Sequence, residues 1–551
     1  MSQNTNVTQH IDGVAGLKKQ KMSPISIAFF IYCLTAAGAF GIEAMIPSCG
    51  PGMTILMLIV IPVVWAIPIC MSVSELSAFM PEENGLYVWV KEAFGEMWGF
   101  FVGWWATLSI YLGMASYVVL VVGYASKFLP ISATGAMCIK IGMILLFTVI
   151  NLLGTKEVAL LDTIFSVLIL GAFGLVTVVG FANWDYNPIE PFIAPETSVF
   201  GCIGSAICIG IWMYCGYGCI SSMAGEIENP EAIPKGFKIA IPIIMLSYIL
   251  PTVAGLVSMG SWESWGVDGE NAVDYASVLT THLGPVWGVV FLIIAIVGQC
   301  AIFNSYILAG SRSFFVLGND KLCPHFLTKL SKKRRVPYWP ILILAAITML
   351  LMNLDFSVIL TIICPLGIIC YVVLAFAFVK LRKKYPIEER GDVYHVKGGV
   401  PAVVFMVICP VVVGIFGLYV NGTEYFLLGF ISIVTAVIFY IAFKWIYGGL
   451  YKIDPIKYPI NEKTRLAKGD ITRIGIFFFL FGIILFAGAF FLAWYEGEWG
   501  PDYYLDLYGS GVMSDFWGMI KIGKIGGGVM IAAGAVMYLI GKKTDPVPKN
   551  N

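Results

Sequence analysis

Long apolar stretches recur along almost the whole length of this chain. A helix needs about 20 predominantly apolar residues to cross the hydrocarbon core of a membrane, and such stretches follow one another from Ser23 to residue 541. Hydrophobic residues make up 59% of the 551 residues and charged residues only 12%, whereas a soluble globular protein carries about 25% charged residues. The sequence therefore predicts an all-α polytopic membrane protein and excludes a cytosolic enzyme or a secreted domain.

We expect about fourteen transmembrane helices. The predicted spans are 25–48, 53–79, 95–125, 134–153, 159–182, 199–223, 237–260, 284–314, 338–353, 357–381, 399–420, 425–446, 472–495 and 519–541. The first twelve form a predicted core at 23–450, a cytoplasmic linker follows at 451–471, and two extra transmembrane helices occupy 472–541. Tails at 1–22 and 542–551 complete the predicted division.

The distribution of basic residues predicts the orientation of the spans. Loops that fall on one side of the membrane carry the Lys and Arg residues of 18–21, 329–335, 380–384, 457–473 and 542–543. The loops 183–198 and 261–284 contain no Lys or Arg but several acidic residues. Because the cytoplasmic loops of membrane proteins are rich in Lys and Arg, we expect both termini on the cytoplasmic side of the plasma membrane.

Neither a metal site nor an enzyme active site is indicated. Most of the 13 cysteines lie inside apolar runs without paired spacing, and the four histidines fall in tails, loops or span ends. No nucleophile–base pair is found at depth. The 34 basic and 34 acidic residues leave no net charge, so nucleic acid is not an expected partner. We expect no cofactor, and the expected partners are the lipid bilayer and a small-molecule substrate.

Two spans contain helix-breaking residues near their centres. In the first span the segment 38–43 (GAFGIE) is followed by Pro47, and in the sixth span the segment is 212–219 (WMYCGYGC). Backbone groups freed inside a membrane must face protein, water or a ligand. Taken singly, either glycine cluster could serve close helix packing. Paired breaks five spans apart favour a five-plus-five inverted repeat with a substrate site at its centre.

These breaks supply candidate substrate-binding residues. The amino ends of half-helices present free N–H groups that suit a carboxylate, and the carboxyl ends present carbonyls that suit an ammonium group. We expect the first break to receive a carboxylate and the carbonyls of the sixth span to receive an amine. The candidates are Gly38, Ala39, Phe40, Gly41, Ile42 and Glu43 in the first span, and Tyr214, Gly216, Tyr217 and Gly218 in the sixth.

Glu43 is the one acidic side chain that we expect at depth. A carboxylate near the bilayer centre costs at least about 2.5–3.5 kcal/mol, so it should face a cavity or a partner. Three roles are open: Glu43 binds a substrate ammonium group, exchanges the coupling proton, or hydrogen-bonds the unwound backbone and holds the break. We favour a functional role and take Glu43 as the candidate proton-coupling residue.

Three further motifs carry a family resemblance. They are Ser74-Glu75-Leu76-Ser77 through Gly103-Trp104, Ala224-Gly225-Glu226-Ile227-Glu228-Asn229-Pro230 through Lys235, and Ser311-Arg312 through Phe326. They resemble the segments after spans two, six and eight of the amino acid–polyamine–organocation (APC) superfamily. The resemblance covers residues 23–450. It implies an inverted repeat with discontinuous spans one and six, and transport by alternating access.

Within that superfamily the segment Phe40–Glu43 looks most like the polyamine-uptake branch, which usually carries an acid where this chain has Gly218. Because a polyamine needs several separated carboxylates or aromatic faces, this difference favours an amino acid or a monoamine. Trp212 is similar in position to the gating tryptophan of arginine–agmatine antiporters, and we expect it to line or close the pocket with Tyr214 and Tyr217. Tyr111 and Tyr117 in the third span are further candidates, of which we expect one to face the pocket.

We therefore expect a permease, not an enzyme, that moves amino acids or related amines by secondary active transport. Some relatives carry a lysine inside span five, but the segment 163–182 has no Lys or Arg. Proton coupling through Glu43, sodium coupling and substrate exchange all stay open. The alternatives are a polyamine or agmatine–putrescine transporter and, more remotely, a membrane nutrient sensor that does not transport.

Overall fold

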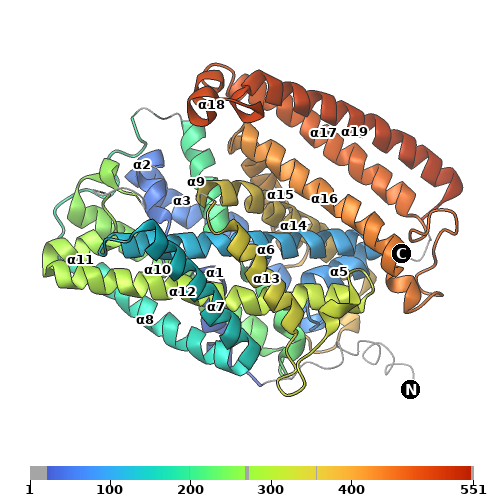
Figure 1. The fold of residues 1–551 in the computed structure, drawn as a ribbon, viewed down its shortest axis with the longest axis horizontal. Helices are drawn as coiled ribbons and strands as arrows, with labels where there is room; N and C mark the ends of the chain where they lie inside the picture. Colours follow the sequence, from blue (N-terminus) through green and yellow to red (C-terminus); the bar gives the residue numbers. More distant parts are fainter. Residues whose placement is uncertain are drawn as a thin grey trace.

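The computed structural model describes residues 21–547, apart from Ala37, Glu196, Ser198, 267–271 and Asp355. The predicted amino-terminal tail lies outside the described residues, except for its last two positions. The α-helices of Figure 1 are α1 (Pro24–Thr35), α2 (Met45–Cys49), α3 (Pro51–Ile61), α4 (Ile67–Phe79), α5 (Gly85–Phe94), α6 (Glu96–Ser126), α7 (Ala133–Leu153), α8 (Thr155–Ala182), α9 (Val199–Met213), α10 (Ala232–Met259), α11 (Tyr275–Leu283), α12 (Pro285–Asn319), α13 (Tyr338–Leu351), α14 (Phe356–Lys384), α15 (Gly399–Val420), α16 (Thr423–Tyr447), α17 (Asp470–Tyr495), α18 (Gly500–Tyr508) and α19 (Phe516–Thr544).

The helices confirm the predicted fold class. Within the described ranges, twelve helices are long and apolar enough to cross a membrane, and α3 and α4 form one of them through the π-helical turn η2 (Pro62–Ala66). The two other predicted spans are the first, which is broken, and the ninth, which is the 14-residue helix α13. The short helices α5 and α11 lie in segments that the sequence analysis treated as loops. The protein is thus an all-α, multi-pass membrane protein.

Glycine, proline and serine set many of the helix ends. At α1 the hydroxyl of Ser23 accepts a hydrogen bond from the N–H of Ser26 at 3.1 Å, and Pro24 occupies the first helical position. At α12 the chain turns at Gly284, whose φ of 102° is left-handed, and the helix starts at Pro285. Proline at a first turn loses no internal hydrogen bond, which explains why it starts these helices.

The two broken spans lie side by side and run in opposite directions. The first span consists of α1, an unwound segment, the 3₁₀ segment η1 (Ile42–Ala44) and α2. The sixth consists of α9, a second unwound segment and the 3₁₀ segment η3 (Tyr217–Glu226). Helix α1 contacts η3, while α2 contacts α9. The beginning of each span therefore meets the end of the other, and both predicted discontinuities are confirmed.

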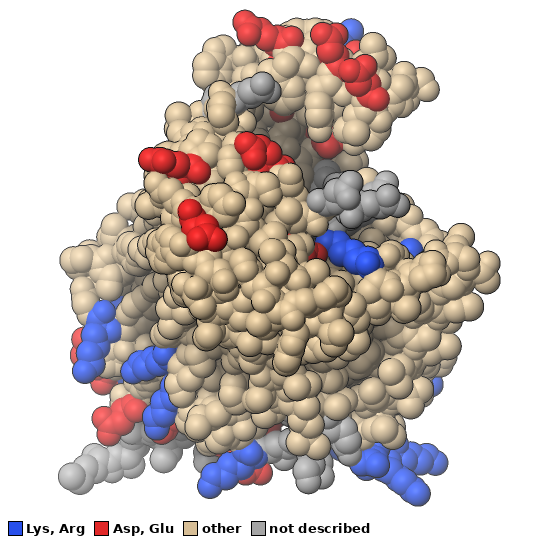
Figure 2. All heavy atoms as spheres, turned by 90° about the vertical axis from the view of Figure 1, so that its left-hand side faces the viewer, with Lys and Arg blue, Asp and Glu red and all other residues tan. Residues whose placement is uncertain are grey.

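Long helices surround this broken pair. Helix α6 packs against α12 and α14, and α8 packs against α1, α10 and α12. The loops with the basic segments 329–335 and 457–473 lie at one end of the bundle, and α11 lies at the other (Figure 1). We call these the basic end and the acidic end. Figure 2 shows the acidic end: most of this face is uncharged, and its acidic side chains gather mainly in the upper half.

The last two long helices form a close pair along one edge of the bundle, beside α16 (Figure 1). Glycines bring α17 and α19 together: a Cβ at Gly475 would lie 2.5 Å from the backbone nitrogen of Tyr538, and one at Gly482 would lie 2.7 Å from that of Ile531. A Cβ at Gly527 would lie 2.6 Å from the nitrogen of Phe486. Small residues at these positions let the two backbones touch, as is typical of packed membrane helices.

A buried ion pair ties α6 to α16 at the basic end. The Lys444 ammonium lies 2.6 Å from both carboxylate oxygens of Glu96, and the side chains are 0% and 1% exposed. The N–H of Leu450 donates to the same carboxylate at 3.2 Å. Removing one partner of such a pair leaves an uncompensated buried charge.

We expect Lys444→Met to lower the free energy of unfolding by about 3–5 kcal/mol, because Glu96 loses its only ion-pair partner in the described structure. Thermal unfolding of the purified protein in detergent measures the effect. The double variant Glu96→Gln/Lys444→Met removes both charges and should recover most of the lost stability. Equal melting temperatures for wild type and Lys444→Met would contradict this account.

Candidate functional site

Two small cavities adjoin each other at the centre of the bundle, beside the break of the sixth span. Their volumes are about 40 and 60 Å³, and their shared walls are formed by Ser109, Ile110, Cys215, Tyr306 and Gly367. One water occupies about 30 Å³ of liquid, whereas small-molecule sites measure about 300–1,000 Å³. The central site is therefore closed in this structure. Larger hollows, of about 690 and 680 Å³, lie away from both breaks.

The two breaks touch each other beside these cavities. Gly216 has a φ of 98°, and a Cβ there would collide with the carbonyl oxygen of Leu34 in α1. Gly41 has a φ of 95°, and a Cβ there would lie 2.9 Å from the ring of Trp212. Both positions require glycine for the backbone angle as well as for space. Trp212 thus lies between the break of the first span and the first cavity, whose wall it forms.

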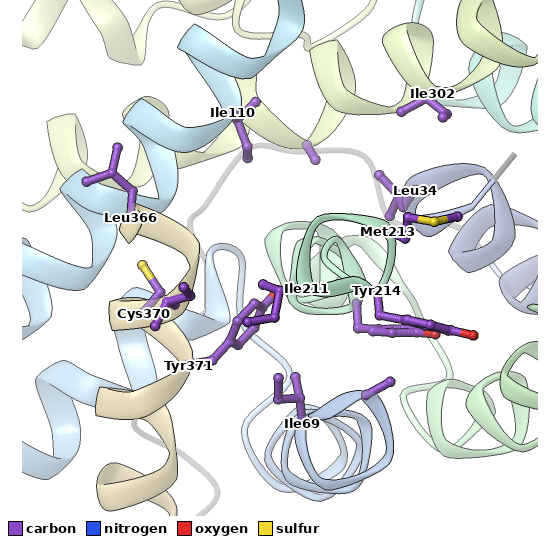
Figure 3. Packing of buried hydrophobic residues seen from close by; sticks show 14 of the residues in the cluster. Leu34, Ile69, Ile110, Ile211, Met213, Tyr214, Ile302, Leu366, Cys370 and Tyr371 are labelled. Atoms are coloured by element: carbon purple, nitrogen blue, oxygen red, sulfur yellow. The ribbon is translucent and has the colours of Figure 1, made fainter. Parts of the chain in front are cut away.

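Helix α14 supports the sixth-span break from the opposite side. The N–H of Gly218 donates to the hydroxyl of Tyr371 at 3.2 Å, which satisfies one freed backbone group. In Figure 3, Tyr371 extends from α14 toward the sixth span, whereas Tyr214 points away from α14. The hydroxyl of Tyr214 instead reaches the carbonyl of Leu58 at 3.5 Å, and its ring packs on Tyr248.

The predicted site residues therefore fall into two groups. Trp212 and Gly216 line the cavities, and Gly38, Gly41 and Gly218 belong to the breaks beside them. The residues Tyr214, Tyr217 and Tyr111 are buried but line neither cavity. Tyr111 faces α13, where its hydroxyl donates to the carbonyl of Pro340 at 3.1 Å.

Phe40 belongs to an aromatic cluster on the acidic-end side of the break. Its ring centroid lies 5.0 Å from that of Phe173 and 5.4 Å from that of Tyr124. Phe291 and Tyr275 also pack on Phe173. The neighbouring Ala39 and Ile42 are completely buried. Five rings from the first, third, fifth and eighth spans and α11 thus close the path between the cavities and the acidic end.

Glu43 follows directly after this cluster, in η1. Its side chain is buried, and the N–H of Gly41 donates to its Oε2 at 2.7 Å. Lys127 and Asp274 are the charged groups near enough to act on it electrostatically, and they form their own ion pair at 2.7 Å. Glu43 lines neither cavity. The structure therefore connects it to the break and to the acidic end.

Ion pairs close the basic end. Arg312 of α12 donates to Glu226 of η3 at 2.8 Å, which fixes the end of the sixth span to the eighth. Lys91 of α5 and Asp320 pair at 2.6 Å. In the loop before α5, burial raises the pKa of the Glu82 carboxyl group to about 7. The ammonium of Lys91 opposes this rise, and the carboxylates of Glu83 and Asp320 add to it. This end is therefore held by polar contacts close to the water interface.

A buried carboxylate inside the fifth span corrects the expectation that Glu43 is the one acidic side chain at depth. Asp162 in α8 is 1% exposed and accepts hydrogen bonds from Ser305 at 2.8 Å and Asn304 at 3.1 Å, both on α12. The sequence signal was present, because an acid inside an apolar span marks a functional site by default. Asp162 lies directly before the segment 163–182 and was not among the predicted site residues.

Other cavity residues gave no signal in the sequence. Tyr306 and Tyr371 line the cavities but are ordinary aromatic residues within continuous helices. Aromatic residues of this kind are common throughout the chain, which contains 26 tyrosines. Only the packing of α12 and α14 around the sixth span selects these two. Of the two candidates in the third span, Tyr117 lines the first cavity and Tyr111 does not.

Known transporters resemble this chain in sequence and in fold. The chain is 26% identical over 411 residues to the polyamine transporter RMV1 of Arabidopsis thaliana, covering 73% of this chain and 81% of that protein. It is 29% identical over 332 residues to the serine/threonine exchanger SteT of Bacillus subtilis, covering 58% of this chain and 73% of SteT. The solved structure of MhsT in complex with L-phenylalanine shares the fold, with a TM-score of 0.53 and 12% identity, and covers 73% of this chain and all of MhsT.

The sequence profile of one family spans most of the transporter-like core. The profile described as "Amino acid permease" matches residues 22–443, which include both broken spans and all the helices that line the cavities. The resemblance seen in the sequence motifs is confirmed, and the chain belongs to the amino acid permease family.

Proposed function

We propose that this protein is a secondary active transporter that moves an amino acid or a related amine across the plasma membrane by alternating access. The observation that carries the proposal is the contact between the two breaks, with Gly216 against the carbonyl of Leu34 beside the central cavities. Unwound backbone at this depth is tolerated where it is buried in protein or lines a cavity. Membership of the permease family supports the same reading.

The breaks provide chemistry for both ends of an amino acid. N–H groups around Gly38–Ile42 suit the carboxylate, and carbonyls around Tyr214–Gly218 suit the amine. Trp212 and Tyr306 would cover the side chain of the substrate, since both line the first cavity. Because the cavities are too small for an amino acid, the helices around them must separate before a substrate enters.

The cavity walls favour a neutral amino acid over a polyamine. The two walls contain serines, cysteines, aromatic and aliphatic residues and one asparagine, but no Asp or Glu among the described residues. A polyamine carries separated ammonium groups that need carboxylates or aromatic faces. The similarity to the serine/threonine exchanger SteT agrees with an amino acid. The similarity to RMV1 keeps polyamine transport as the second candidate.

The distribution of charge supports an orientation with the basic end in the cytoplasm. The basic loops gather there, and the acidic-end loops 183–198 and 261–284 carry acids without Lys or Arg. Ion pairs such as Arg312–Glu226 would then form the inner closure, and the aromatic cluster around Phe40 the outer one.

Counterflow into liposomes tests the proposed function. We expect wild-type protein to accumulate at least one labelled neutral amino acid from a panel that also contains putrescine and spermidine. Uptake must depend on the same unlabelled substrate inside, as exchange through one site requires. If binding occurs without counterflow, the protein is a sensor, and if putrescine alone is exchanged, the second candidate replaces the first.

Trp212→Ala should raise the KM for exchange by a factor of about 5–30, because losing an aromatic contact of about 1–2 kcal/mol weakens binding to that extent. Trp212→Phe should keep most of the affinity. Trp494, which is 75% exposed at the end of α17, offers the matched control, and Trp494→Ala should exchange like wild type. An unchanged KM in Trp212→Ala would remove this residue from the site.

Glu43→Gln tests the predicted proton-coupling role. Glutamine keeps the size of the side chain and can still accept the hydrogen bond from Gly41, but it cannot bind a proton. We expect wild-type uptake to fall by up to about tenfold per unit as the external pH rises, and the variant to show a clearly shallower dependence on pH. A wild-type pH profile in the variant would leave Glu43 only the structural role of holding the break.

A further inference from the structure

A hydrogen-bonded cluster around Asp162 joins four helices beside the central cavities. The side chain extends from α8, and its two oxygens accept from Ser305 and Asn304 of α12. On the α7 side, Asn151 donates to the amide oxygen of Asn304 at 2.9 Å. On the α1 side, the thiol of Cys33 donates to the backbone carbonyl of Asp162 at 3.2 Å. The function proposed above uses none of these groups.

Among the described residues Asp162 has no cationic partner, unlike five other buried carboxylates of this protein. Those five carboxylates form ion pairs, which are Glu75 with Arg382, Glu96 with Lys444, Glu226 with Arg312, Asp274 with Lys127, and Asp470 with Arg473. The donors to Asp162 are a neutral hydroxyl and a neutral amide. An ionised carboxylate buried without a cation is costly, so such a group is held neutral by a proton or accompanied by a bound cation.

The titratable surroundings of Asp162 are sparse on every helix that packs against α8. Helix α1 presents the thiol of Cys33, and α7 and α12 present the neutral groups described above. The described side chains do not include those of 155–159. Among the described side chains of α10 and α11, no charged group lies against the Asp162 carboxyl group. Asn151 also keeps a buried amide oxygen without a hydrogen-bond partner. Among the described side chains, the cluster therefore has a spare acceptor and no cation to balance an ionised Asp162.

Ser305 allows the cluster to hold Asp162 in two protonation states. Its hydroxyl oxygen lies 2.8 Å from Asp162 and 3.0 Å from the carbonyl oxygen of Ala301, yet it carries a single hydrogen. With an ionised Asp162, the hydroxyl donates to the carboxylate. With a protonated Asp162, the carboxyl O–H donates to the hydroxyl oxygen, which turns its own hydrogen to Ala301. Each state keeps its hydrogen bonds, and the difference between them is one proton.

We propose that Asp162 is a proton-binding site of the transport cycle and that its proton is taken up and released together with the substrate. This inference rests on the proposed function. Ser305 is followed directly by Tyr306, which lines both cavities, and Cys33 lies in the last turn of α1 before the break. A change in the Ser305 hydrogen bonds is thus transmitted to the wall of the substrate site. A proton fits the cluster better than a sodium ion, because the amide nitrogen of Asn304 already faces the carboxylate.

Proton movement in liposomes tests this site. Wild type, Asp162→Asn and Asp470→Asn are reconstituted with a pH-sensitive dye inside, and a substrate identified by counterflow is added outside. We expect Asp162→Asn to keep counterflow within about threefold of wild type but to lose proton uptake and the accumulation driven by an acidic exterior. Asp470→Asn is the matched control, since it makes the same change in a buried aspartate of α17 that has Arg473 as its partner. It should behave like wild type.

Opposite outcomes overturn the proposal clearly. Proton uptake that persists in Asp162→Asn removes the residue from coupling. If a sodium gradient drives wild-type uptake and Asp162→Asn abolishes that dependence, the cluster binds a metal cation and the proton assignment is wrong. Ser305→Ala adds a graded test: it should keep proton uptake but shift its pH midpoint, because the carboxyl O–H loses its acceptor.

Infrared spectroscopy separates this inference from the proposed function. If wild type shows no counterflow with any substrate, the proposed function fails, but proton binding can still be read from the carbonyl stretch of a protonated carboxyl group. We expect a component of that band to titrate with pH in wild type, and this component to be lost in Asp162→Asn and to shift in Ser305→Ala. Identical spectra for wild type and Asp162→Asn would overturn the proposal even if the protein transports.

Discussion

Backbone groups that lose their helical partners inside a bilayer are the constraint on which this structure depends. Water is not present in the hydrocarbon region to satisfy them, so each must find a partner in the protein or face a cavity. Here the N–H of Gly41 finds Glu43, and the N–H of Gly218 finds Tyr371. Glu43 belongs to the same span as Gly41, whereas Tyr371 comes from α14, so satisfying the break of the sixth span also fixes how α14 meets it. The site and the fold are therefore consequences of the same requirement.

The two ends of the central site are closed by different interactions. At the acidic end, aromatic rings around Phe40 exclude water by non-directional packing. At the basic end, pairs such as Arg312–Glu226 depend on geometry and on the local dielectric. Water entering at the basic end can replace the partners of a charged group, whereas opening the acidic end exposes apolar rings. In the proposed alternating-access cycle, opening the acidic end would expose apolar surface and opening the basic end would separate charges, and these two energies respond differently to pH and salt.

Some features of the fold and of the central site follow from the sequence alone, and others do not. The apolar spans and both breaks were predicted, because hydrophobic length and the glycines at 38, 41 and 216 act locally. The helical character of α5 was missed, since its apolar pattern is short and lies between two spans. Tyr111 was a candidate but faces α13, and Tyr371 was not a candidate but supports the break. Which face of a membrane helix looks inward depends on its neighbours, and all faces of these helices are apolar.

Asp162 shows the same division between local and tertiary information. Its presence in an apolar span could be read directly from the chain, and it indicated a buried acid without naming partners. That those partners are Asn304 and Ser305, more than 140 positions away, follows only from the packing of α8 on α12.

By itself, the sequence determined that this chain crosses the membrane many times and that its first and sixth spans cannot be continuous helices. The reason is that hydrophobicity and backbone conformation are properties of short segments. Only the tertiary structure decided that the two breaks touch, which tyrosines line the cavities, and that the described hydrogen-bond donors to Asp162 are neutral groups. Those features arise from contacts between helices far apart in the chain, and their geometry depends on how the whole bundle packs.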